Sequence, residues 1–410
     1  MGGVNRADGG GTGDGTRGVA EGGGVRGAGR GGVRGGVRAA AGGANLLALR
    51  SHNTALVLDL LRTAGSQGIS RLELAERTGL TPQAVSKITA RLRAEGLAAE
   101  AGRRASTGGK PRTVLRLVPE AGHAVGVHLD RDELRAVLVD LTGAVVGERR
   151  SPLDLGAGAP AVLEGVARAA GGLVADVLGV PGGRLADAPT LLGLGVALPG
   201  PLDHVRGVLH RVTGFPEWDG FPLRDALTRH LGVPVVVDKD TNAAALGLAV
   251  GGERGSFAYL HLGTGLGAGL VFGGGVHRGA RTGAGEFGHQ VVQLDGPPCT
   301  CGGRGCVEAL CLGAVARDDL AEAARVLGAG AANLAGLLDI DLVLLGGRTV
   351  AGAPEVFVSG VGAVLDARAR REGGREGAVP VRIAPGGTRG VAQGAAQLLL
   401  APLFGRGDGP

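Results

Sequence analysis

The sequence is poor in aromatic residues, with seven Phe, one Trp and one Tyr among 410 residues. A hydrophobic core must therefore be built mainly from Leu, Val and Ala. The sequence also lacks any run of about 18 apolar residues, and its N-terminal stretch has no apolar segment typical of a secretory signal. These absences predict a soluble cytoplasmic protein, and its length suffices for two or three domains.

The net charge is only +5, but it is unevenly distributed. Residues 1–43 carry six Arg against three acidic residues, and residues 44–118 carry twelve Lys or Arg against five acidic residues. Residues 119–410 therefore have a net charge near −5. This asymmetry is expected if only the N-terminal part contacts an anionic polymer such as DNA, although a solvated basic surface would have the same composition.

Residues 1–43 are rich in Gly and Arg and contain too little apolar surface to offset the entropy cost of folding. We expect this segment to be a disordered tail. Its arginines could add weak, sequence-independent attraction to phosphates, or the tail could be dispensable.

Residues 44–118 begin with helical signals. Leucines at helical spacing between Leu46 and Leu61 indicate one or two helices that end near Gly65. The stretch Ser70–Glu73 is a capping box that starts a further helix. Gly79 is placed to end that helix in a left-handed conformation.

A second helix is predicted to start after Thr81-Pro82, because Thr is a good N-cap and Pro suits the first helical position. It should run to about Glu95. Its inner face is expected to contain Val85, Ile88 and Leu92. Its outer face is expected to present Gln83, Ser86, Lys87 and Ala90. Two short helices around a Gly-containing turn indicate a helix-turn-helix, although three merely structural helices remain an alternative.

After this helix, Leu97–Glu100 and Thr113–Val118 have strand-like composition. Between them lies a predicted loop, Gly102–Arg112, whose basic residues are Arg103, Arg104, Lys110 and Arg112. A hairpin with a basic tip is able to contact the sugar-phosphate backbone or the minor groove.

Three of the four cysteines, Cys299, Cys301 and Cys306, fall within eight residues, and His289 precedes the first by ten. One His and three Cys separated by Gly-rich turns are typical of a closed tetrahedral zinc site, since Zn²⁺ takes S and N ligands. Ordinary buried thiols and a disulfide are the alternatives, and no secretory context supports the disulfide.

The segment Gly285–Glu308 reads GEFGHQVVQLDGPPCTCGGRGCVE. Its pattern ExGH followed by CxCGxxGCxE resembles the signature of the ROK family, which comprises sugar-responsive repressors, open reading frames and sugar kinases. The resemblance implies a structural zinc held by His289 and the three cysteines. It also implies that Glu286, His289 and Glu308 contact a sugar.

The resemblance extends over about residues 45–400 and implies the fold class. We expect an α/β, actin-like (ribonuclease H-like) two-lobed domain over residues 119–410. The stretch GLTPQAVSKITARLRAEGL, with GGKPRTVLRL after it, resembles the winged-helix DNA reader of ROK repressors, so residues 44–118 are expected to be a winged helix-turn-helix domain. The side chains then expected to contact DNA are Thr81, Gln83, Ser86, Lys87, Arg91, Arg104, Lys110 and Arg112.

Sugar kinases of this family hold phosphate on a Gly-rich loop between the first two strands of the domain. Here the run is Gly126–Glu133, in which the glycines that approach phosphate are missing and Asp130, Asp132 and Glu133 would repel it. A second loop, Gly263–Gly269, resembles the family's second phosphate loop and keeps its glycines. Half a phosphate site is poor support for phosphoryl transfer.

By resemblance, Asp240 occupies the position of the family's catalytic Asp, and Lys239 replaces the Asn that usually precedes it. Gly214 stands where kinases often have a sugar-contacting Asn. Trp218, the only tryptophan, is either a packing anchor or a stacking platform for a ligand.

These observations favour a sugar-responsive transcriptional repressor that binds operator DNA and a carbohydrate and forms a homodimer or homotetramer. The competing hypothesis is an ATP-dependent sugar kinase with Asp240 as general base. A third is a zinc-stabilised sugar sensor that acts through protein partners. We expect a non-enzymatic regulator, because the first phosphate loop is degraded and a DNA reader is attached.

Overall fold

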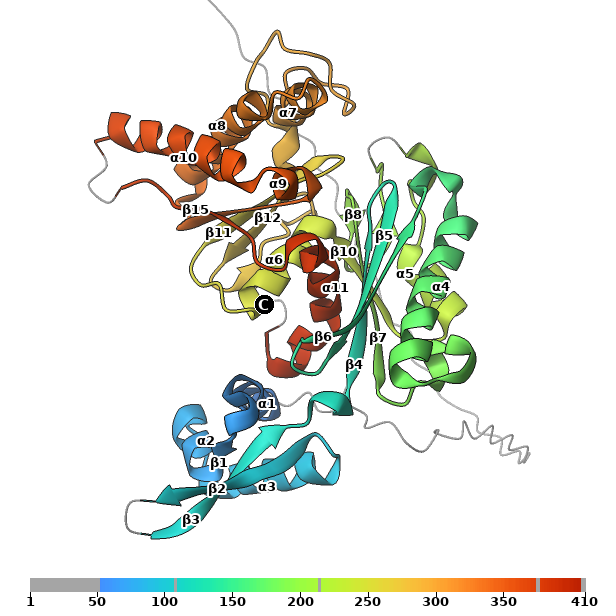
Figure 1. The fold of residues 1–410 in the computed structure, drawn as a ribbon, viewed down its shortest axis with the longest axis vertical. Helices are drawn as coiled ribbons and strands as arrows, with labels where there is room; N and C mark the ends of the chain where they lie inside the picture. The colour runs from blue at the N-terminus through green and yellow to red at the C-terminus, as the bar shows by residue number, and fades with distance from the viewer. Residues whose placement is uncertain (1–51, 107–108, 213–214, 374–376, 407–410) are drawn as a thin grey trace, which may run out of the picture. The chain divides into compact units, whose positions relative to one another are not determined.

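The computed structural model describes residues 52–106, 109–212, 215–373 and 377–406 (Figure 1). The predicted disordered tail (1–43), the expected helix start at Leu46 and the position of Gly214 lie outside the described residues. The side chains of Arg104 and Lys110 lie outside them as well.

The N-terminal segment consists of three helices and a three-stranded sheet. They are α1 (His52–Ala64), β1 (Ile69–Ser70), α2 (Arg71–Thr78), α3 (Pro82–Ala94), β2 (Ala98–Ser106) and β3 (Gly109–Leu117), with strand order β1-β3-β2. The capping box is confirmed, since Ser70 and Glu73 bond each other's backbone N–H groups. Gly79 ends α2 in the left-handed conformation, and the Thr81 side chain accepts the N–H of Ala84 at the start of α3.

The predicted loop Gly102–Arg112 is wrong. The hairpin strands continue much further, so that Ser106 pairs with Gly109 in the register of β2 and β3. The sequence pattern did not indicate this because two irregularities, between Glu100 and Gly102 and between Arg104 and Ser106, interrupt the alternation of the strand. Gly102 adopts a φ of 132°, which explains how a residue typical of loops is accommodated within a bulged strand.

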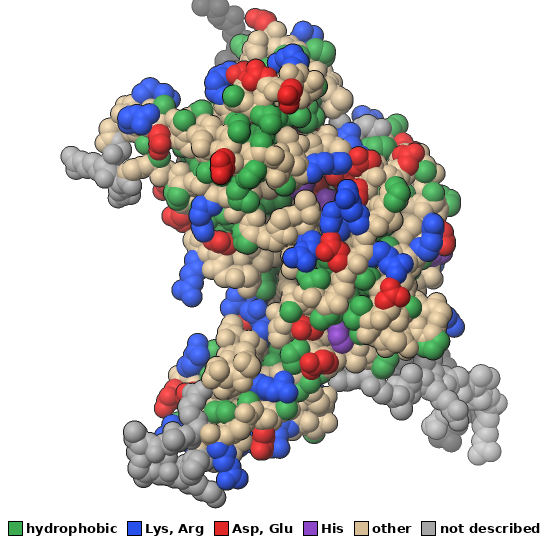
Figure 2. Space-filling view, viewed as in Figure 1, with side chains coloured by type: hydrophobic (Ala, Val, Ile, Leu, Met, Phe, Trp, Pro, Cys, Tyr) green, Lys and Arg blue, Asp and Glu red, His purple; other side chains and the backbone are tan. Residues whose placement is uncertain are grey.

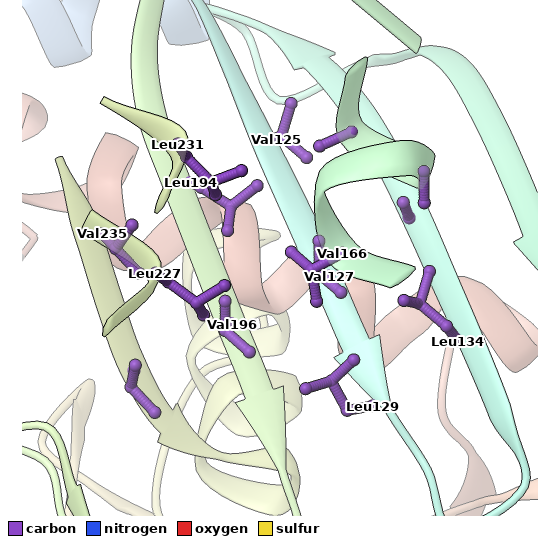
Figure 3. Packing of buried hydrophobic residues seen from close by; sticks show 14 of the residues in the cluster. Val125, Val127, Leu129, Leu134, Val166, Leu194, Val196, Leu227, Leu231 and Val235 are labelled. Carbon is purple, nitrogen blue, oxygen red and sulfur yellow. The ribbon is translucent and has the colours of Figure 1, made fainter. Parts of the chain in front are cut away.

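The first lobe is built on a five-stranded sheet of order β10-β7-β4-β5-β6. Its strands are β4 (His123–Leu129), β5 (Glu133–Asp140), β6 (Val145–Pro152), β7 (Leu191–Leu198) and β10 (Val235–Lys239). Helices α4 (Ala159–Leu178) and α5 (Leu223–Leu231) cover one face (Figure 1). Figure 3 shows this packing, in which Val166 of α4 faces Val127 of β4. A small ribbon, β8 (Leu202–Asp203) and β9 (Val208–Leu209), follows β7.

The second lobe has a five-stranded sheet of order β13-β12-β11-β14-β15. Its strands are β11 (Phe257–Leu262), β12 (Leu266–Phe272), β13 (Gly275–Val276), β14 (Leu342–Gly346) and β15 (Val381–Ile383). Its helices are α7 (Val307–Ala316), α8 (Leu320–Leu338), α9 (Arg348–Gly352) and α10 (Pro354–Arg371). In both lobes the loops that follow the carboxyl ends of the parallel strands line the cleft described below.

Helices α6 (Asp240–Val250) and α11 (Gly390–Leu400) pack against each other between the two sheets (Figure 1). Their contact depends on small residues. A Cβ atom on Gly394 of α11 would lie 1.9 Å from the carbonyl oxygen of Ala243 in α6. Where α11 packs on β4, one on Gly126 would likewise lie 1.9 Å from the carbonyl oxygen of Ala392. Only glycine therefore lets these backbones approach so closely.

Buried apolar residues are mainly Leu, Val and Ala, as the scarcity of aromatic residues predicts. Among the described residues, we find no helix with the length and hydrophobicity needed to cross a bilayer.

Candidate functional site

A cavity of about 80 Å³ lies between the two lobes and collects most of the predicted site residues. Figure 2 shows basic, acidic and histidine side chains gathered where the lobes meet. The polar side chains that line the cavity are Asp130, Arg131, Lys239, Asp240, Thr241, His261, Thr264, Glu286, His289 and Glu308. The volume is below the roughly 300–1,000 Å³ of typical ligand sites.

Asp240 is the first residue of α6 and follows directly after β10, at the carboxyl end of a parallel strand. One of its carboxylate oxygens accepts the N–H of Thr241 at 2.6 Å. The other has no hydrogen bond from a described residue and is available to a ligand hydroxyl in the cavity. The strand runs to Lys239, which places Asp240 at the start of a helix.

A buried ion pair, which was not predicted from the sequence, stabilises the backbone next to Asp240. Asp238 is almost completely buried, and Arg278 donates to it from Nε at 2.8 Å and from Nη2 at 2.7 Å. The Asn242 side chain also donates to Asp238, at 3.0 Å. These bonds connect β10 and α6 to the loop after β13, and a buried pair of this kind fixes geometry even where it adds little net stability.

Lys239 extends into the cavity with only 4% of its side chain exposed. Its ammonium group donates to the carbonyl oxygen of Ala284 at 2.5 Å and to Glu286 Oε1 at 3.2 Å. Glu286 is thus not a free carboxylate. One oxygen is held by Lys239, and only the other remains for a ligand.

Glu308 is buried in the first turn of α7, where the helix dipole favours a carboxylate. Its Oε2 accepts the N–H of Leu266 at 2.8 Å, which connects α7 to the start of β12. Glu308 and Glu286 therefore reach the same cavity from opposite ends of the cysteine-containing segment.

The structure brings His289, Cys299, Cys301 and Cys306 together, and one potential ligand atom from each lies within 4.8 Å of all the others. His289 belongs to the short 3₁₀-helix η8 (Phe287–His289), and its Nδ1 is 3.7 Å from Cys299 Sγ. This four-residue cluster could hold a metal ion.

Tight turns shape the segment around the cluster. Gly302 has a φ of 92°, directly after Cys301. Gly305 precedes Cys306, and a Cβ atom there would lie 1.6 Å from the carbonyl oxygen of Gln293. The fourth cysteine, Cys311, lies apart from the cluster inside α7, where burial raises the pKa of its thiol to about 12.

The turn between β4 and β5 contains Asp130 and Asp132, and both carboxylates bind Arg348 of the second lobe. Arg348 Nη2 lies 2.8 Å from Asp130 Oδ2, and Nη1 lies 2.9 Å from Asp132 Oδ2. Thr264, from the second Gly-rich loop, donates to Asp130 Oδ1 at 2.7 Å. These contacts join the two lobes across the cleft.

The hydrogen bonds also settle the ionisation of the two acids. Burial by itself raises the pKa of Asp130, but the interaction with His128, the hydrogen bonds from Thr264 and the Arg131 N–H, and the charge of Arg348 hold that pKa below its ordinary value. The hydrogen bond from Arg348 lowers the pKa of Asp132. Both carboxylates are therefore charged at neutral pH.

A pair of histidines beside the cavity was missed by sequence reasoning. The rings of His128 in β4 and His261 in β11 pack edge to face with centroids 6.0 Å apart. His261 Nδ1 is 2.9 Å from the hydroxyl of Tyr259, whereas the buried Nε2 of His128 has no partner. Burial lowers the pKa of His128, against the opposing charge of Asp240, so the ring is neutral. A signal existed, because each histidine is the penultimate residue of a strand whose neighbouring residues are apolar.

The residues predicted to contact DNA from α3 are all exposed: Thr81, Gln83, Ser86, Lys87 and Arg91. Arg91 is paired with Glu95 at 2.9 Å. The inner face contains Val85 and Leu92 as predicted, and also Thr89, which accepts a hydrogen bond from Arg71 of α2 at 3.2 Å. Arg112 of the hairpin is exposed as well.

Comparison with known proteins identifies both parts of the chain. Residues 126–319 match the ROK family, and residues 58–98 match winged helix-turn-helix DNA-binding domains. A ROK hexokinase from Thermus thermophilus, known from its crystal structure, is 30% identical, has a TM-score of 0.52, and is matched over 67% of this chain and 96% of its own. The chain belongs to the ROK family.

Two further similarities characterise this ROK protein. A xylose repressor from Bacillus spizizenii is 29% identical over 244 residues, which are 58% of this chain and 61% of the repressor. The chain thus spans about three fifths of the length of the first curated relatives it matches. A ROK family transcriptional regulator described as a homolog of the E. coli MLC protein has a TM-score of 0.68 at 20% identity, over 87% of this chain and 98% of that one.

The last similarity shows the fold alone, and it extends over the winged helix as well as the two lobes. The predicted fold class is therefore confirmed: an actin-like ROK domain preceded by a winged helix-turn-helix. Within this ROK fold, Trp218 is a packing anchor, since it is buried and its indole N–H donates to the Leu155 carbonyl at 3.0 Å.

Replacing His128 with Gln is expected to flatten the pH dependence of stability. Since burial lowers the pKa of His128, the unfolded chain binds a proton at this residue below about pH 6.5 while the folded chain does not. The free energy of unfolding therefore falls with decreasing pH in this range, by at most about 1.4 kcal/mol per pH unit from this residue. Urea unfolding between about pH 5.5 and 7.5 measures the slope. His230→Gln, which changes an exposed histidine, should keep the wild-type slope. Equal slopes for wild type and His128→Gln would contradict the assignment.

Proposed function

We propose that this ROK protein is a sugar-responsive, DNA-binding transcriptional repressor without catalytic turnover. In this proposal residues 44–118 are the DNA reader and residues 119–410 the sugar-binding domain. The observation that carries it is the convergence of Asp240, Glu286, His289 and Glu308 on one cavity, in a chain that also has a winged helix.

The DNA-reading part of the proposal is supported by the outer face of α3. It presents Gln83, Ser86 and Lys87 to solvent while Val85 and Leu92 are buried, which suits a recognition helix in a major groove. Arg104, Lys110 and Arg112 of the hairpin would contact the phosphate backbone. A homodimer or homotetramer would place two readers on two half-sites.

The cluster of His289 and the three cysteines suits structural Zn²⁺. Sulfur ligands 2.3 Å from a tetrahedral zinc lie about 3.8 Å apart. Cys301 Sγ and Cys306 Sγ are 3.7 Å apart, which supports this geometry. Bound zinc would fix the turns of the segment. With Nδ1 of His289 on the metal side, Nε2 would carry the proton and donate to a sugar hydroxyl.

The carboxylates of Asp240, Glu286 and Glu308 would accept hydrogen bonds from further hydroxyls. Because the cavity lies between the lobes, a bound sugar would change their closure and with it the spacing of two readers in a dimer. The effector acts only if it binds one of these states more tightly than the other.

A sugar kinase is the second candidate, favoured by the similarity to a hexokinase and by the position of Asp240. A coupled assay for ADP release over a panel of sugars discriminates the two. Turnover that is lost in Asp240→Asn would support the kinase. Sugar binding without DNA binding would instead favour a sensor that acts through protein partners.

The wild-type protein is expected to shift DNA from its own upstream region in a mobility-shift assay, and variants of α3 should weaken the shift. Gln83→Ala should cost about 5- to 100-fold in affinity, since one base contact contributes about 1–3 kcal/mol. Lys87→Ala should lower the salt dependence of binding by about one released ion. Arg184→Ala, which removes an exposed arginine of the first lobe, should leave binding unchanged. Absence of a shift at low salt would contradict the assignment of residues 44–118 as a DNA-binding domain.

The Asp240→Asn variant is expected to weaken sugar binding by about 10- to 100-fold, because a charged hydrogen bond contributes about 1.5–3 kcal/mol. The asparagine side chain has the same shape as aspartate, and its amide oxygen can still accept the Thr241 N–H. The free energy of unfolding and the affinity for the operator should therefore stay near the wild-type values. Calorimetric titration with D-xylose, D-glucose and N-acetylglucosamine measures the affinity. Asp225→Asn on α5 is a matched control on the surface. Unaltered sugar affinity in Asp240→Asn would remove this residue from the site.

Cys301→Ser is expected to lose bound zinc and to unfold several degrees below wild type, since metal binding contributes to folding. Zinc per chain is measured by elemental analysis, and substitution with Co²⁺ should give the absorption of tetrahedral thiolate coordination in wild type only. Cys311→Ala is the control. It removes a buried thiol outside the cluster and should lower stability while zinc content is retained. The same zinc content in Cys301→Ser and wild type would exclude the cluster as the metal site.

A further inference from the structure

We propose that the effector of the cleft is an uncharged, unphosphorylated sugar, and that Asp130, Asp132 and Arg348 form a specificity element that keeps phosphosugars out. The proposal deepens the proposed function, on which it rests, by naming the class of ligand. It is carried by the charges around the cavity and by the hydrogen bonds of these three residues.

The cavity is lined by an excess of negative charge. Four carboxylates, those of Asp130, Asp240, Glu286 and Glu308, line it, against two cationic side chains, Lys239 and Arg131. Lys239 is already occupied by Glu286 and the Ala284 carbonyl. A phosphate group would add up to two negative charges to this poorly solvated space, where repulsion between charges a few ångströms apart amounts to several kcal/mol at an effective dielectric constant of about 20.

The groups best suited to bind a phosphate are already used by the protein's own carboxylates. Arg348 directs both terminal nitrogens of its guanidinium group at Asp130 and Asp132. Thr264, in the glycine-rich loop after β11, gives its hydroxyl proton to Asp130. Asp130 also accepts the backbone N–H of Arg131 at 2.8 Å. These two carboxylates thus occupy the donors of Arg348 and Thr264, which leaves Arg131 as the one cationic side chain of the lining that is not paired with a described carboxylate.

What remains in the cavity suits a neutral polyol. Asp240 and Glu286 each retain one oxygen without a described partner, and Glu308 has one oxygen beyond the bond to Leu266. Acceptor oxygens pair with donor hydroxyls, which a free sugar supplies in number. An anionic substituent has only acceptors to offer, so each carboxylate that faced it would be left without a donor.

The test is calorimetric titration of the full chain with pairs of ligands that differ only by a phosphate. The pairs are D-glucose with D-glucose 6-phosphate, N-acetylglucosamine with its 6-phosphate, and D-xylose with its 5-phosphate, and inorganic phosphate is titrated alone. The wild-type protein should bind at least one free sugar and bind its phosphate ester about 10- to 100-fold more weakly. Inorganic phosphate should show no binding.

The double variant Asp130→Asn/Asp132→Asn keeps the shape of both side chains and frees Arg348. It should reduce the discrimination against the phosphate ester by about tenfold or more, and it should bind inorganic phosphate measurably. Adding Arg348→Met should abolish both gains. The matched control Asp176→Asn/Asp187→Asn, on the surface of the same lobe, should retain wild-type discrimination. If the double variant unfolds, Asp132→Asn alone provides the test, because 61% of that side chain is exposed.

The results distinguish failure of the specificity element from failure of the proposed sugar-binding function. A purely structural role of the bridge between the lobes would change the affinity for both members of a pair equally, and unchanged discrimination in the double variant would therefore refute the specificity element. Wild-type protein that binds a phosphate ester more tightly than its parent sugar would refute the ligand class and leave the sugar-binding function standing. Failure of every sugar and ester to bind, with DNA binding intact, would refute the proposed effector itself.

Discussion

The convergence of one imidazole and three thiols is the constraint on which the candidate sugar site depends. Between Gly285 and Cys306 the chain has only one short 3₁₀ turn and no strand or α-helix. The conformation of this segment comes from tight glycine turns, from backbone hydrogen bonds such as that of the Val292 N–H to the Gly305 carbonyl, from the burial of Phe287 and from the four-residue cluster. Glu286 and Glu308 flank the segment, and both line the cavity. A change at the cluster is therefore expected to move both carboxylates.

The rest of the cleft follows from the way charges are paired inside it. Two buried cations, Lys239 and Arg278, lie at the end of β10 and just after β13, and each has a carboxylate partner. A buried ion pair costs desolvation and gains little net stability, but it tolerates few arrangements of its partners. Arg348 extends the same principle across the cleft to Asp130. Ion pairs therefore connect the two lobes across the cleft, whereas the contact between α6 and α11 depends on small residues.

Much of the fold could be predicted from the sequence where its cause is local. The capping box at Ser70 and the left-handed Gly79 depend on four or five neighbouring residues, and both are confirmed. The strand continuation beyond Gly102 was hidden by two irregularities that interrupt its alternation, and the reach of Arg348 to Asp130 depends on a partner 218 residues away. No local pattern encodes such partners. The cysteine spacing was informative because the chemistry of a metal site demands it, whereas a histidine such as His128 gains meaning only beside its neighbour.

The scarcity of aromatic residues has a further use. The only tryptophan, Trp218, lies in the first lobe, and the only tyrosine, Tyr259, lies in the second. Trp218 follows Phe215, whose ring lies 5.6 Å from the guanidinium carbon of the cavity residue Arg131, and Tyr259 shares a hydrogen bond with His261. The protein thus contains its one tryptophan in the first lobe and its one tyrosine in the second, so selectively excited tryptophan emission reports on the first side of the cleft alone, without any label attached.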